Sequence, residues 1–198
     1  MINFINLNQS KPYNKFLESY NAAAEKNQKN IEAISISSFN HKLNEVDSRF
    51  VNLKYIIDNE WIFFSNYNSP KNSAFDSHQQ ISGLFFWQKT NTQIRLKGTI
   101  HKTSKHFNNE YFINRSSQKN ALAISSDQSK PIDSYESVEA NYYSSLESGD
   151  FKKCPDYWGG YSFTPYYFEF WEGHPARLNK RVSYSKVDQV WESLILQP

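Results

Sequence analysis

The sequence predicts one mainly β domain, an antiparallel barrel or sandwich with helices packed on its outside. Three observations support this prediction. Apolar and polar residues alternate in several short segments, as in half-buried strands. Most of these segments come in pairs separated by short polar turns, which is typical of β-hairpins. The alternation of strands and helices that builds a parallel sheet is missing.

Composition narrows the classes of protein to which the chain can belong. Its 198 residues suffice for one ordinary domain, and Phe, Tyr and Trp make up 17% of them, far more than a disordered chain carries. The formal net charge of +2 excludes a strongly basic nucleic-acid-binding protein. The one cysteine, Cys154, excludes an intramolecular disulfide framework and a cysteine-rich zinc site, and it fits a reducing compartment.

The sequence shows neither a membrane span nor a targeting segment. No apolar run reaches the roughly 18–20 residues of a span. The first residues lack the basic segment and the long apolar segment of a signal peptide. We therefore expect a cytoplasmic protein that has neither a membrane nor a nucleic acid as partner.

The first 30 residues are predicted to form a helical arm. Phe16, Leu17, Tyr20 and Ala24 recur near helical spacing, which predicts a helix over residues 10–30. We expect residues 1–30 to lie as an arm or flank on a main domain of residues 31–198.

The main domain is predicted to consist of β-hairpins with a helical insertion. The pairs Asp58-Asn59 and Thr90-Asn91 are polar turns between β-rich segments. Lys130-Pro131 separates two helical segments, and Trp158-Gly159-Gly160 is typical of a turn and packing unit. The predicted strands are residues 31–38, 47–58, 60–67, 81–89, 92–104, 161–173, 176–187 and 190–196. The predicted helices are residues 69–80, 105–126 and 133–149.

The sequence lacks several well-known catalytic and ligand-binding motifs. The motifs of a serine nucleophile elbow, a phosphate-binding loop, a zinc-binding helix and a dinucleotide-binding turn do not occur. The five histidines show no metal-ligand spacing. No metal site is predicted.

Basic residues are scattered among the β segments. Each alone is most simply a solvated surface charge, but as a set they indicate an anion site, because Arg and Lys bind phosphate through charge-assisted hydrogen bonds. Arg49 and Lys54 lie five positions apart, which places them on opposite faces of an ideal strand. Both can reach one site only if a bulge intervenes or the ligand lies at the end of the strand. The other members of the set are Lys71, Arg95, Arg115, Lys119, Arg177 and Arg181.

Eight segments, in order, resemble the motifs of the pyridoxamine 5'-phosphate oxidases, a family of FMN enzymes with a split-barrel fold. The resemblance runs from about Ala33 to Pro198. Each segment alone is weak evidence, whereas the ordered set is strong. The segments are RFVNLK (49–54), FFSNYNSPK (63–71), QIRLKG (93–98), YFINR (111–115), SDQS (126–129), WGG (158–160), EFWEG (169–173) and RLNKR (177–181).

The resemblance implies an antiparallel FMN-binding split β-barrel that forms an intertwined homodimer through its C-terminal strands, with FMN in a cleft between the subunits. The residues that it implies for the cofactor are Arg49, Lys54, Phe64, Ser65, Lys71, Gln93, Gln128, Ser129, Trp171 and Arg181. The residues that it implies for the substrate are Lys54, Tyr111, Arg115, Lys119, Arg177 and Asn179, with Arg177 and Asn179 as the catalytic pair.

The implied activity is the FMN-dependent oxidation of pyridoxamine or pyridoxine 5'-phosphate to pyridoxal 5'-phosphate, with O2 as acceptor and H2O2 as product. Six residues depart from the family pattern. Lys119 stands where the family has Ser, Asn179 where it has His, and Lys180 where it has Asp. Pro70, Thr92 and Ile195 stand where the family has basic residues. Two alternatives therefore stay open. One is a related flavin oxidase with another substrate, such as a phenazine precursor; the other is a non-catalytic protein that binds FMN or pyridoxal phosphate.

Overall fold

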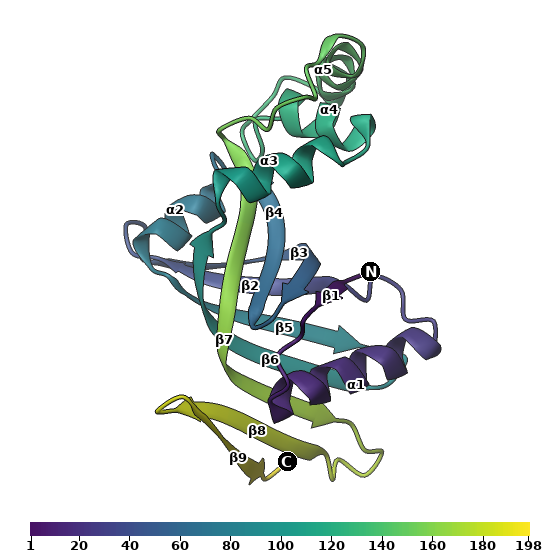
Figure 1. Cartoon of the computed structure of the whole chain (residues 1–198), viewed down its shortest axis with the longest axis vertical. Coiled ribbons are helices and arrows are strands. Elements are labelled where there is room, and N and C mark those ends of the chain that lie inside the picture. Colours follow the sequence, from purple (N-terminus) through teal and green to yellow (C-terminus); the bar gives the residue numbers. More distant parts are fainter.

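The computed structural model describes residues 1–198, which form a β-barrel with helices at one end and along one side (Figure 1). Its strands are β1 (Asn3–Ile5), β2 (Ala33–Asn40), β3 (Glu45–Ile57), β4 (Glu60–Asn66), β5 (Gln80–Trp87), β6 (Thr92–Lys102), β7 (Trp158–Glu172), β8 (Lys180–Val187) and β9 (Val190–Leu196). Its helices are α1 (Lys11–Glu25), α2 (Pro70–Ser77), α3 (Lys105–Ile113), α4 (Ser117–Ser125) and α5 (Tyr135–Ser148).

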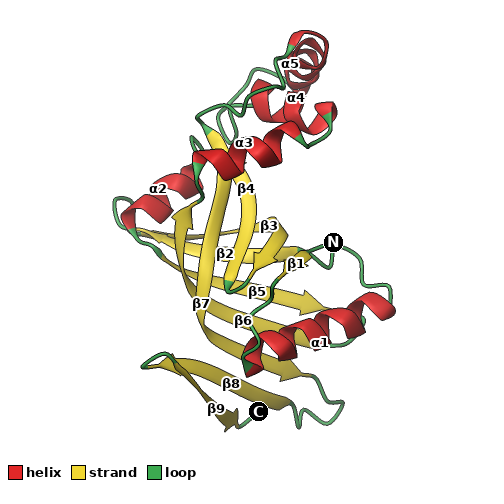
Figure 2. Ribbon diagram, in the orientation of Figure 1, coloured by secondary structure: helices red, strands yellow, loops and turns green.

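All nine strands belong to one sheet that closes on itself. The sheet runs in the order β1-β3-β2-β5-β6-β7-β8-β9, and β4 pairs with both β3 and β7. This double pairing joins the two ends of the curved sheet, so β3, β2, β5, β6, β7 and β4 form the barrel. The β8–β9 hairpin extends from β7 beyond the barrel (Figure 2).

The predicted hairpins are confirmed, and their turns have the expected chemistry. Asp58 and Asn91 adopt positive φ angles of 49° in the β3–β4 and β5–β6 turns, a conformation that Asn and Asp tolerate better than most residues. Asp188 and Gln189 do the same between β8 and β9, with φ angles of 45° and 67°. Two successive positive φ angles match the right-handed twist of the flanking strands.

The barrel core is aromatic and includes the N-terminal segment. Along β2 and β5 every second residue is buried, which is the alternation seen in the sequence. Helix α1 places Phe16 against Trp61, with ring centroids 4.5 Å apart, and Tyr20 against Trp87 at 5.9 Å. Residues 1–30 thus contribute side chains to the same core as the barrel, and α1 lies along its flank.

Four elements differ from the predictions. Strand β1, which pairs in parallel with β3, is only three residues long and has no readable pattern. The helix predicted over residues 105–126 is two helices, α3 and α4, separated at 114–116. Helix α1 ends at Glu25, before a residue with positive φ at Asn27. The predicted strand 176–187 begins only at Lys180, because residues 173–179 form the loop between β7 and β8.

The predicted turn at Trp158-Gly159-Gly160 is wrong, because these residues begin strand β7. Neither glycine has a positive φ. A Cβ on Gly159 would collide with the side chains of Tyr67 and Asn108, so glycine is needed here for close packing rather than for a turn.

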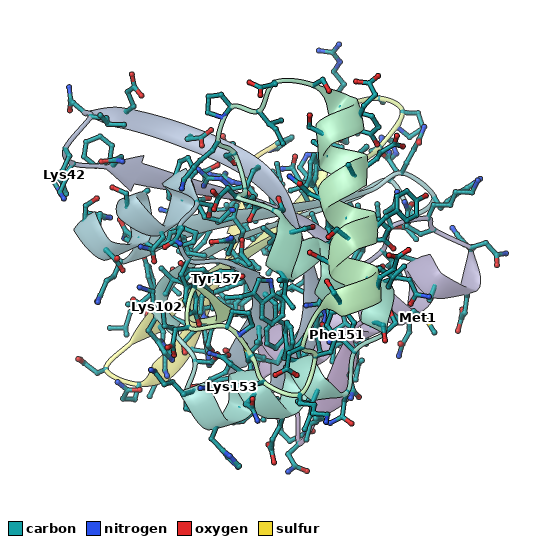
Figure 3. The ribbon with its side chains drawn as sticks, turned by 90° about the horizontal axis from the view of Figure 1, so that it is seen from above. Met1, Lys42, Lys102, Phe151, Lys153 and Tyr157 are labelled. Atoms are coloured by element: carbon teal, nitrogen blue, oxygen red, sulfur yellow. The ribbon has the colours of Figure 1, made fainter.

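Helices α3, α4 and α5 gather at one end of the barrel, where β7 begins. Seen from above (Figure 3), α5 lies uppermost across this end, and Lys42 marks the outer tip of the β2–β3 turn. No helix combines the length and the apolar character needed to cross a bilayer.

Candidate active site

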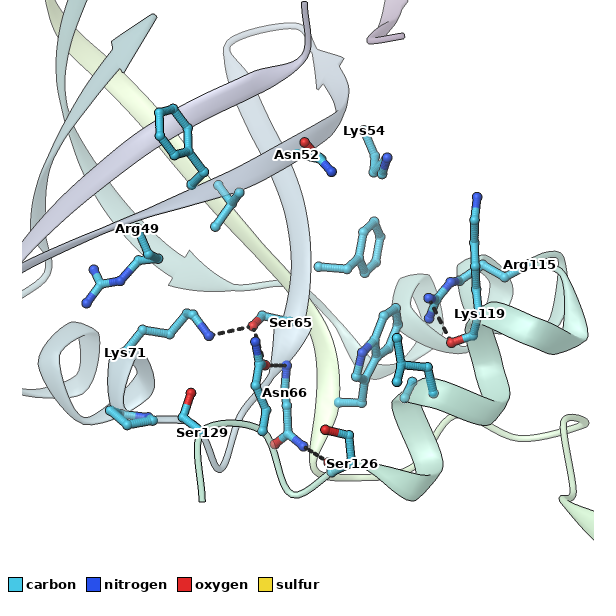
Figure 4. A pocket seen from close by; sticks show the side chains of 18 of the residues that line it. Arg49, Asn52, Lys54, Ser65, Asn66, Lys71, Arg115, Lys119, Ser126 and Ser129 are labelled. Atoms are coloured by element: carbon cyan, nitrogen blue, oxygen red, sulfur yellow. Dashed lines mark hydrogen bonds between the residues drawn. The ribbon is translucent and has the colours of Figure 1, made fainter. Parts of the chain in front are cut away.

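A cavity of about 640 Å³ opens between the barrel wall and the helices at the end of the barrel where β7 begins. Twenty residues line it, from β3, β4, the start of α2, α3, the α3–α4 turn, α4, the α4–α5 segment and the start of β7. Five are cationic and one, Asp47, is acidic. Figure 4 shows the cations in two groups, with Arg49 and Lys71 on one side of Ser65 and Lys54, Arg115 and Lys119 on the other.

At the first end, a buried lysine is held by hydroxyl groups. Lys71 Nζ donates to Ser65 Oγ at 3.0 Å and to Ser69 Oγ at 2.9 Å. Ser65 Oγ in turn donates to Gln128 Oε1 at 3.2 Å, which also accepts from the Asn66 backbone N–H at 3.3 Å. Burial, followed by the charge of Arg49, lowers the pKa of Lys71 to about 8. This end therefore offers a cation and several hydroxyl and amide groups to an anion.

Arg49 is fixed at the same end by groups of the barrel wall. Its Nη1 donates to Ser38 Oγ at 2.8 Å and to the Ile36 carbonyl at 3.3 Å. Its Nη2 forms an ion pair with the Asp47 carboxylate, two residues earlier on β3. Ser129 lines the same end of the cavity, at a positive φ of 72° in the loop after α4.

Arg49 and Lys54 line the same cavity although their spacing is odd. Residues 50–52, which lie between them, also line it, so the cavity is reached from both faces of β3 along this stretch. The pairing of β3 with β4 also shifts register between Leu53 and Tyr55, a β-bulge at Lys54.

Aromatic rings form a wall between the two ends. Phe64 and Tyr111 stack with centroids 3.6 Å apart and an interplanar angle of 10°. Trp158 lies parallel to both, 5.3 Å from Phe64 and 6.2 Å from Tyr111. The Arg115 guanidinium lies over the Trp158 ring at 4.4 Å, a cation–π distance.

The second end carries three cations and no carboxylate. Arg115 Nη2 donates to the Lys119 carbonyl at 3.2 Å, whereas its Nη1 is buried and has no partner. Burial lowers the pKa of Lys54, and the charges of Lys119 and Arg115 lower it further, against the opposing effect of Glu32. Arg115 Nη1 thus keeps an unused hydrogen-bond donor beside the Trp158 ring, at an end of the cavity whose charges attract anions.

The cavity unites ten of the fifteen predicted site residues and leaves five elsewhere. Those that line it are Arg49, Lys54, Phe64, Ser65, Lys71, Tyr111, Arg115, Lys119, Gln128 and Ser129. The five outside it are Gln93, Trp171, Arg177, Asn179 and Arg181. Trp158 at the start of β7 lines the cavity, whereas Trp171 lies near the other end of this strand, roughly 40 Å of extended chain away.

The five outlying residues form a second group around the β7–β8 loop. Gln93, Trp171 and Arg181 are Cα partners across β6, β7 and β8. Arg181 makes two hydrogen bonds to the buried Glu169 carboxylate, from Nε at 3.1 Å and from Nη2 at 2.7 Å. Asn179 Oδ1 accepts from the His174 backbone N–H at 3.0 Å and thereby braces the loop that carries Arg177.

Sequence reasoning missed several residues of the cavity wall. Trp158, Asn66 and Ser126 lie within quoted motifs but were assigned no site role. Asn52 also lies within a quoted motif without a site role, whereas Asp47 precedes all the motifs. A residue two positions from Arg49 on the same strand shares its face, which was the one available signal for Asp47.

Neither the cysteine nor a metal site contributes to the cavity. Cys154 is buried, its Sγ contacts the Trp158 carbonyl at 3.3 Å, and burial raises its pKa to about 11, as expected for an unreactive thiol. No cluster of three or more His, Cys, Asp or Glu side chains has an arrangement that could hold a metal ion.

Comparisons with known proteins match this chain over nearly its whole length. Residues 158–198 match the family model of the pyridoxine 5'-phosphate oxidase C-terminal dimerisation region. The pyridoxine/pyridoxamine 5'-phosphate oxidase 1 of Hydrogenovibrio crunogenus is 34% identical over 96% of this chain and 89% of its own. The corresponding oxidase of Cytophaga hutchinsonii is 35% identical over 87% of this chain and 81% of its own.

Solved structures share the fold. PhzG from Burkholderia lata 383, in complex with tetrahydrophenazine-1-carboxylic acid, superposes with a TM-score of 0.89 at 24% identity, covering 96% of this chain and 93% of PhzG. A pyridoxamine 5'-phosphate oxidase-related, FMN-binding protein from Nostoc punctiforme has a TM-score of 0.78 at 12% identity, covering 96% of this chain and all of its own. The expected split barrel is thereby confirmed, and on the sequence identities above the chain belongs to the pyridoxine/pyridoxamine 5'-phosphate oxidase family.

Proposed function

We propose that this protein is an FMN-dependent oxidase that converts pyridoxamine or pyridoxine 5'-phosphate to pyridoxal 5'-phosphate, with O2 as acceptor and H2O2 as product. One observation carries the proposal: a single cavity has two cationic ends with stacked aromatic rings between them. Two phosphate-bearing ring compounds that react with each other need this combination, because each phosphate requires cations and each ring a flat apolar surface.

The first end of the cavity fits the phosphate and the ribityl chain of FMN. Arg49 and Lys71 supply charge, and Ser65, Gln128 and Ser129 supply hydroxyl and amide groups. The cavity volume lies within the range of ligand sites of this kind. Together with Lys54, these are the residues that the family resemblance assigns to the phosphate and ribityl contacts of FMN.

The second end fits the phosphate of the substrate. Arg115 has a buried nitrogen without a partner, and Lys54 and Lys119 add two further charges. Tyr111 lies between this end and the stacked Phe64, so its hydroxyl group and its ring can contact different parts of one ligand. Lys119, in place of the family's Ser, binds phosphate as a longer point charge.

We infer that a second subunit completes the site. Gln93, Trp171 and Arg181 lie far along the sheet from the cavity of their own chain, and residues 158–198 match a dimerisation region. The outer face of the sheet exposes Phe50, Leu84 and Phe86, at 76%, 37% and 57%. Phe50 and Leu84 pair with the same residue, Ser35, from opposite sides, so the apolar surface is continuous enough to bury in a homodimer.

When bound, FMN supplies the redox chemistry, and the protein supplies binding and orientation. Arg49 and Lys71 would hold the cofactor phosphate, and Lys54 and Arg115 would hold the substrate phosphate, so the protein would fix the position of each ligand through its phosphate. Arg177, from the partner, covers the substrate ring. Asn179 cannot carry a proton at neutral pH and braces the β7–β8 loop, so its role is positional.

A phenazine precursor is the second candidate substrate. Arg115 and Lys119 would bind a carboxylate as well as a phosphate, and Lys119 is the departure from the family pattern at this end. PhzG, which holds a tetrahydrophenazine carboxylic acid, shares the fold. The two candidates differ in the anion that the second end receives.

The test is an anaerobic mixing experiment with the FMN-loaded protein. Pyridoxamine or pyridoxine 5'-phosphate is expected to bleach the visible flavin absorbance, and air to restore it. If only a tetrahydrophenazine carboxylic acid bleaches the flavin, the second candidate replaces the first as the substrate. A flavin-loaded protein that none of these compounds reduces would contradict an oxidase function and favour a binding role.

A further inference from the structure

The phosphate-binding ends of the cavity differ in one respect that the family resemblance does not account for. Asp47 is the one acidic residue among the twenty that line the cavity, and it lies at the Arg49–Lys71 end. Two cations and one carboxylate leave this end with a formal charge of +1. Lys54, Arg115 and Lys119 give the other end +3. The end proposed for the cofactor is thus the less positive of the two.

The Arg49 guanidinium does not need Asp47 to keep its position. Its Nη1 donates to Ser38 Oγ at 2.8 Å and to the Ile36 carbonyl at 3.3 Å, both on the neighbouring strand β2. Its side chain is 17% exposed, whereas that of Asp47 is 68% exposed. The arginine is therefore anchored by the sheet, and the carboxylate approaches it from the solvent side.

Asp47 occupies the part of Arg49 that an incoming phosphate would use. Nη2 makes its ion pair with Asp47 and has no other partner. Of the five N–H donors of Arg49, only Nε–H and the second N–H of Nη2 are left for a phosphate, and both lie on the side of the guanidinium that Asp47 contacts. A phosphate that binds there lies beside the carboxylate or displaces it. In either case a phosphate dianion and a carboxylate come close together, and like charges repel. Lys71 also interacts with both charges, because Arg49 lowers its pKa and Asp47 raises it.

We propose that Asp47 is an internal counter-ion of Arg49 that competes with the phosphate of the cofactor and sets the affinity of this end of the cavity. The inference rests on the proposed function in taking FMN as the ligand of this end. It predicts a cofactor that binds more weakly and exchanges more readily than the cations alone would give. The Asp47 carboxylate is expected to repel the phosphate group of the cofactor and to leave the binding of the flavin ring unchanged.

The test compares Asp47→Asn with Glu45→Gln. Asn has nearly the same shape as Asp without its charge. Glu45 is exposed two residues before Asp47 on β3, on the same face of the strand, and does not line the cavity. Glu45→Gln therefore removes the same charge at a small distance. Apoprotein of each variant is titrated with FMN and with riboflavin, which lacks the phosphate, and flavin fluorescence gives the Kd.

For Asp47→Asn, the Kd for FMN is expected to fall about 3- to 10-fold, because one partly screened repulsion is removed. The Kd for riboflavin should not change, and Glu45→Gln should leave both within about twofold. An unchanged or weaker FMN affinity in Asp47→Asn would overturn the inference. Equal shifts for FMN and riboflavin would overturn it as well, since they would indicate a general structural effect.

A second measurement separates this inference from the proposed function. Inorganic phosphate is added to each apoprotein, and the rise in thermal midpoint is recorded. A larger rise in Asp47→Asn than in wild type supports the counter-ion role even if the wild-type protein fails to bind FMN, a failure that would refute the proposed function alone. An equal rise in both proteins, or none in either, contradicts the counter-ion role.

Discussion

Lys71 is the one buried lysine of the protein, and its surroundings are unusual for a cation. Two serine hydroxyl groups accept from its Nζ, and no carboxylate pairs with it directly. The nearest charges are Arg49, which disfavours its proton, and Asp47, which favours it. A buried cation without a counter-ion is costly, which supports the proposal that an anion binds Lys71 from the cavity.

The pKa of Lys71 predicts how FMN affinity depends on pH. The pKa is lowered to about 8, so the side chain is a cation below about pH 8 and becomes neutral above it. The Kd for FMN should therefore rise as the pH increases through about 8. Fluorescence titrations at a series of pH values measure this dependence. Lys71→Arg is the matched control, because Arg stays charged and should remove the rise; a rise of the same size in Lys71→Arg would exclude Lys71 as its source.

For individual residues, the sequence predicted the cations of the cavity well, but it did not predict which groups pair with them. Arg49, Lys71 and Arg115 could be chosen because each lies in a recognisable motif. Asp47 could not be chosen, because its effect depends on which atom of Arg49 the β2 strand leaves free. Contacts of that kind are decided by side-chain geometry across strands, which the order of residues does not specify.

Among the strands and helices, β7 links the cavity to the second group of predicted site residues. It pairs with β4, β6 and β8, begins at the cavity with Trp158, and ends with Trp171 in the second group of residues. Its first residues pass so close to α3 and β4 that side chains of Tyr67 and Asn108 occupy the space where a Cβ of Gly159 would be. Glycine at position 159 thus allows β7 to pack closely against Tyr67 and Asn108 beside the cavity.

Gly159→Ala is expected to lower the free energy of unfolding by about 1–3 kcal/mol, because the added methyl group meets fixed, hydrogen-bonded groups. Urea unfolding followed by circular dichroism measures the change. Ser162→Ala is the control on the same strand. Its hydroxyl is buried without a partner, so removing it should leave stability unchanged or increase it. Equal losses in both variants would contradict the steric explanation for Gly159.

An element could be predicted from the sequence where its residues form a local pattern. The β3–β4 and β5–β6 hairpins could be predicted, because Asp58 and Asn91 mark their turns and apolar and polar residues alternate in the flanking strands. Strand β1 was not, because three residues carry no periodicity. The bulge at Lys54 could be named as one possibility but not located, since a shift in register is a property of two strands together.

The whole molecule has a net charge of only +2, yet five of its cations line one cavity. Overall charge therefore conceals a strongly positive site. The predicted site residues fall into two groups at opposite ends of β7, and one chain does not bring them together. The fold could be predicted from the family motifs, but the division of the site between two ends of the sheet emerges only from the three-dimensional arrangement.

The central claim is that one oxidase site is built from the cavity of one subunit and the β7–β8 loop of the other. Mixed dimers of two variants test it most directly. Arg115→Ala removes a cavity residue, and Arg177→Ala removes an exposed residue of the loop. The two variants, carrying different tags, are produced together, and oxidation of pyridoxamine 5'-phosphate is measured.

Each variant alone should be nearly inactive. A mixed dimer should contain one site with both substitutions and one intact site, so random pairing should restore about a quarter of the wild-type activity. Activity in the mixture no higher than the mean of the two variants, with mixed dimers shown to be present by sequential tag purification, would contradict a site shared between subunits.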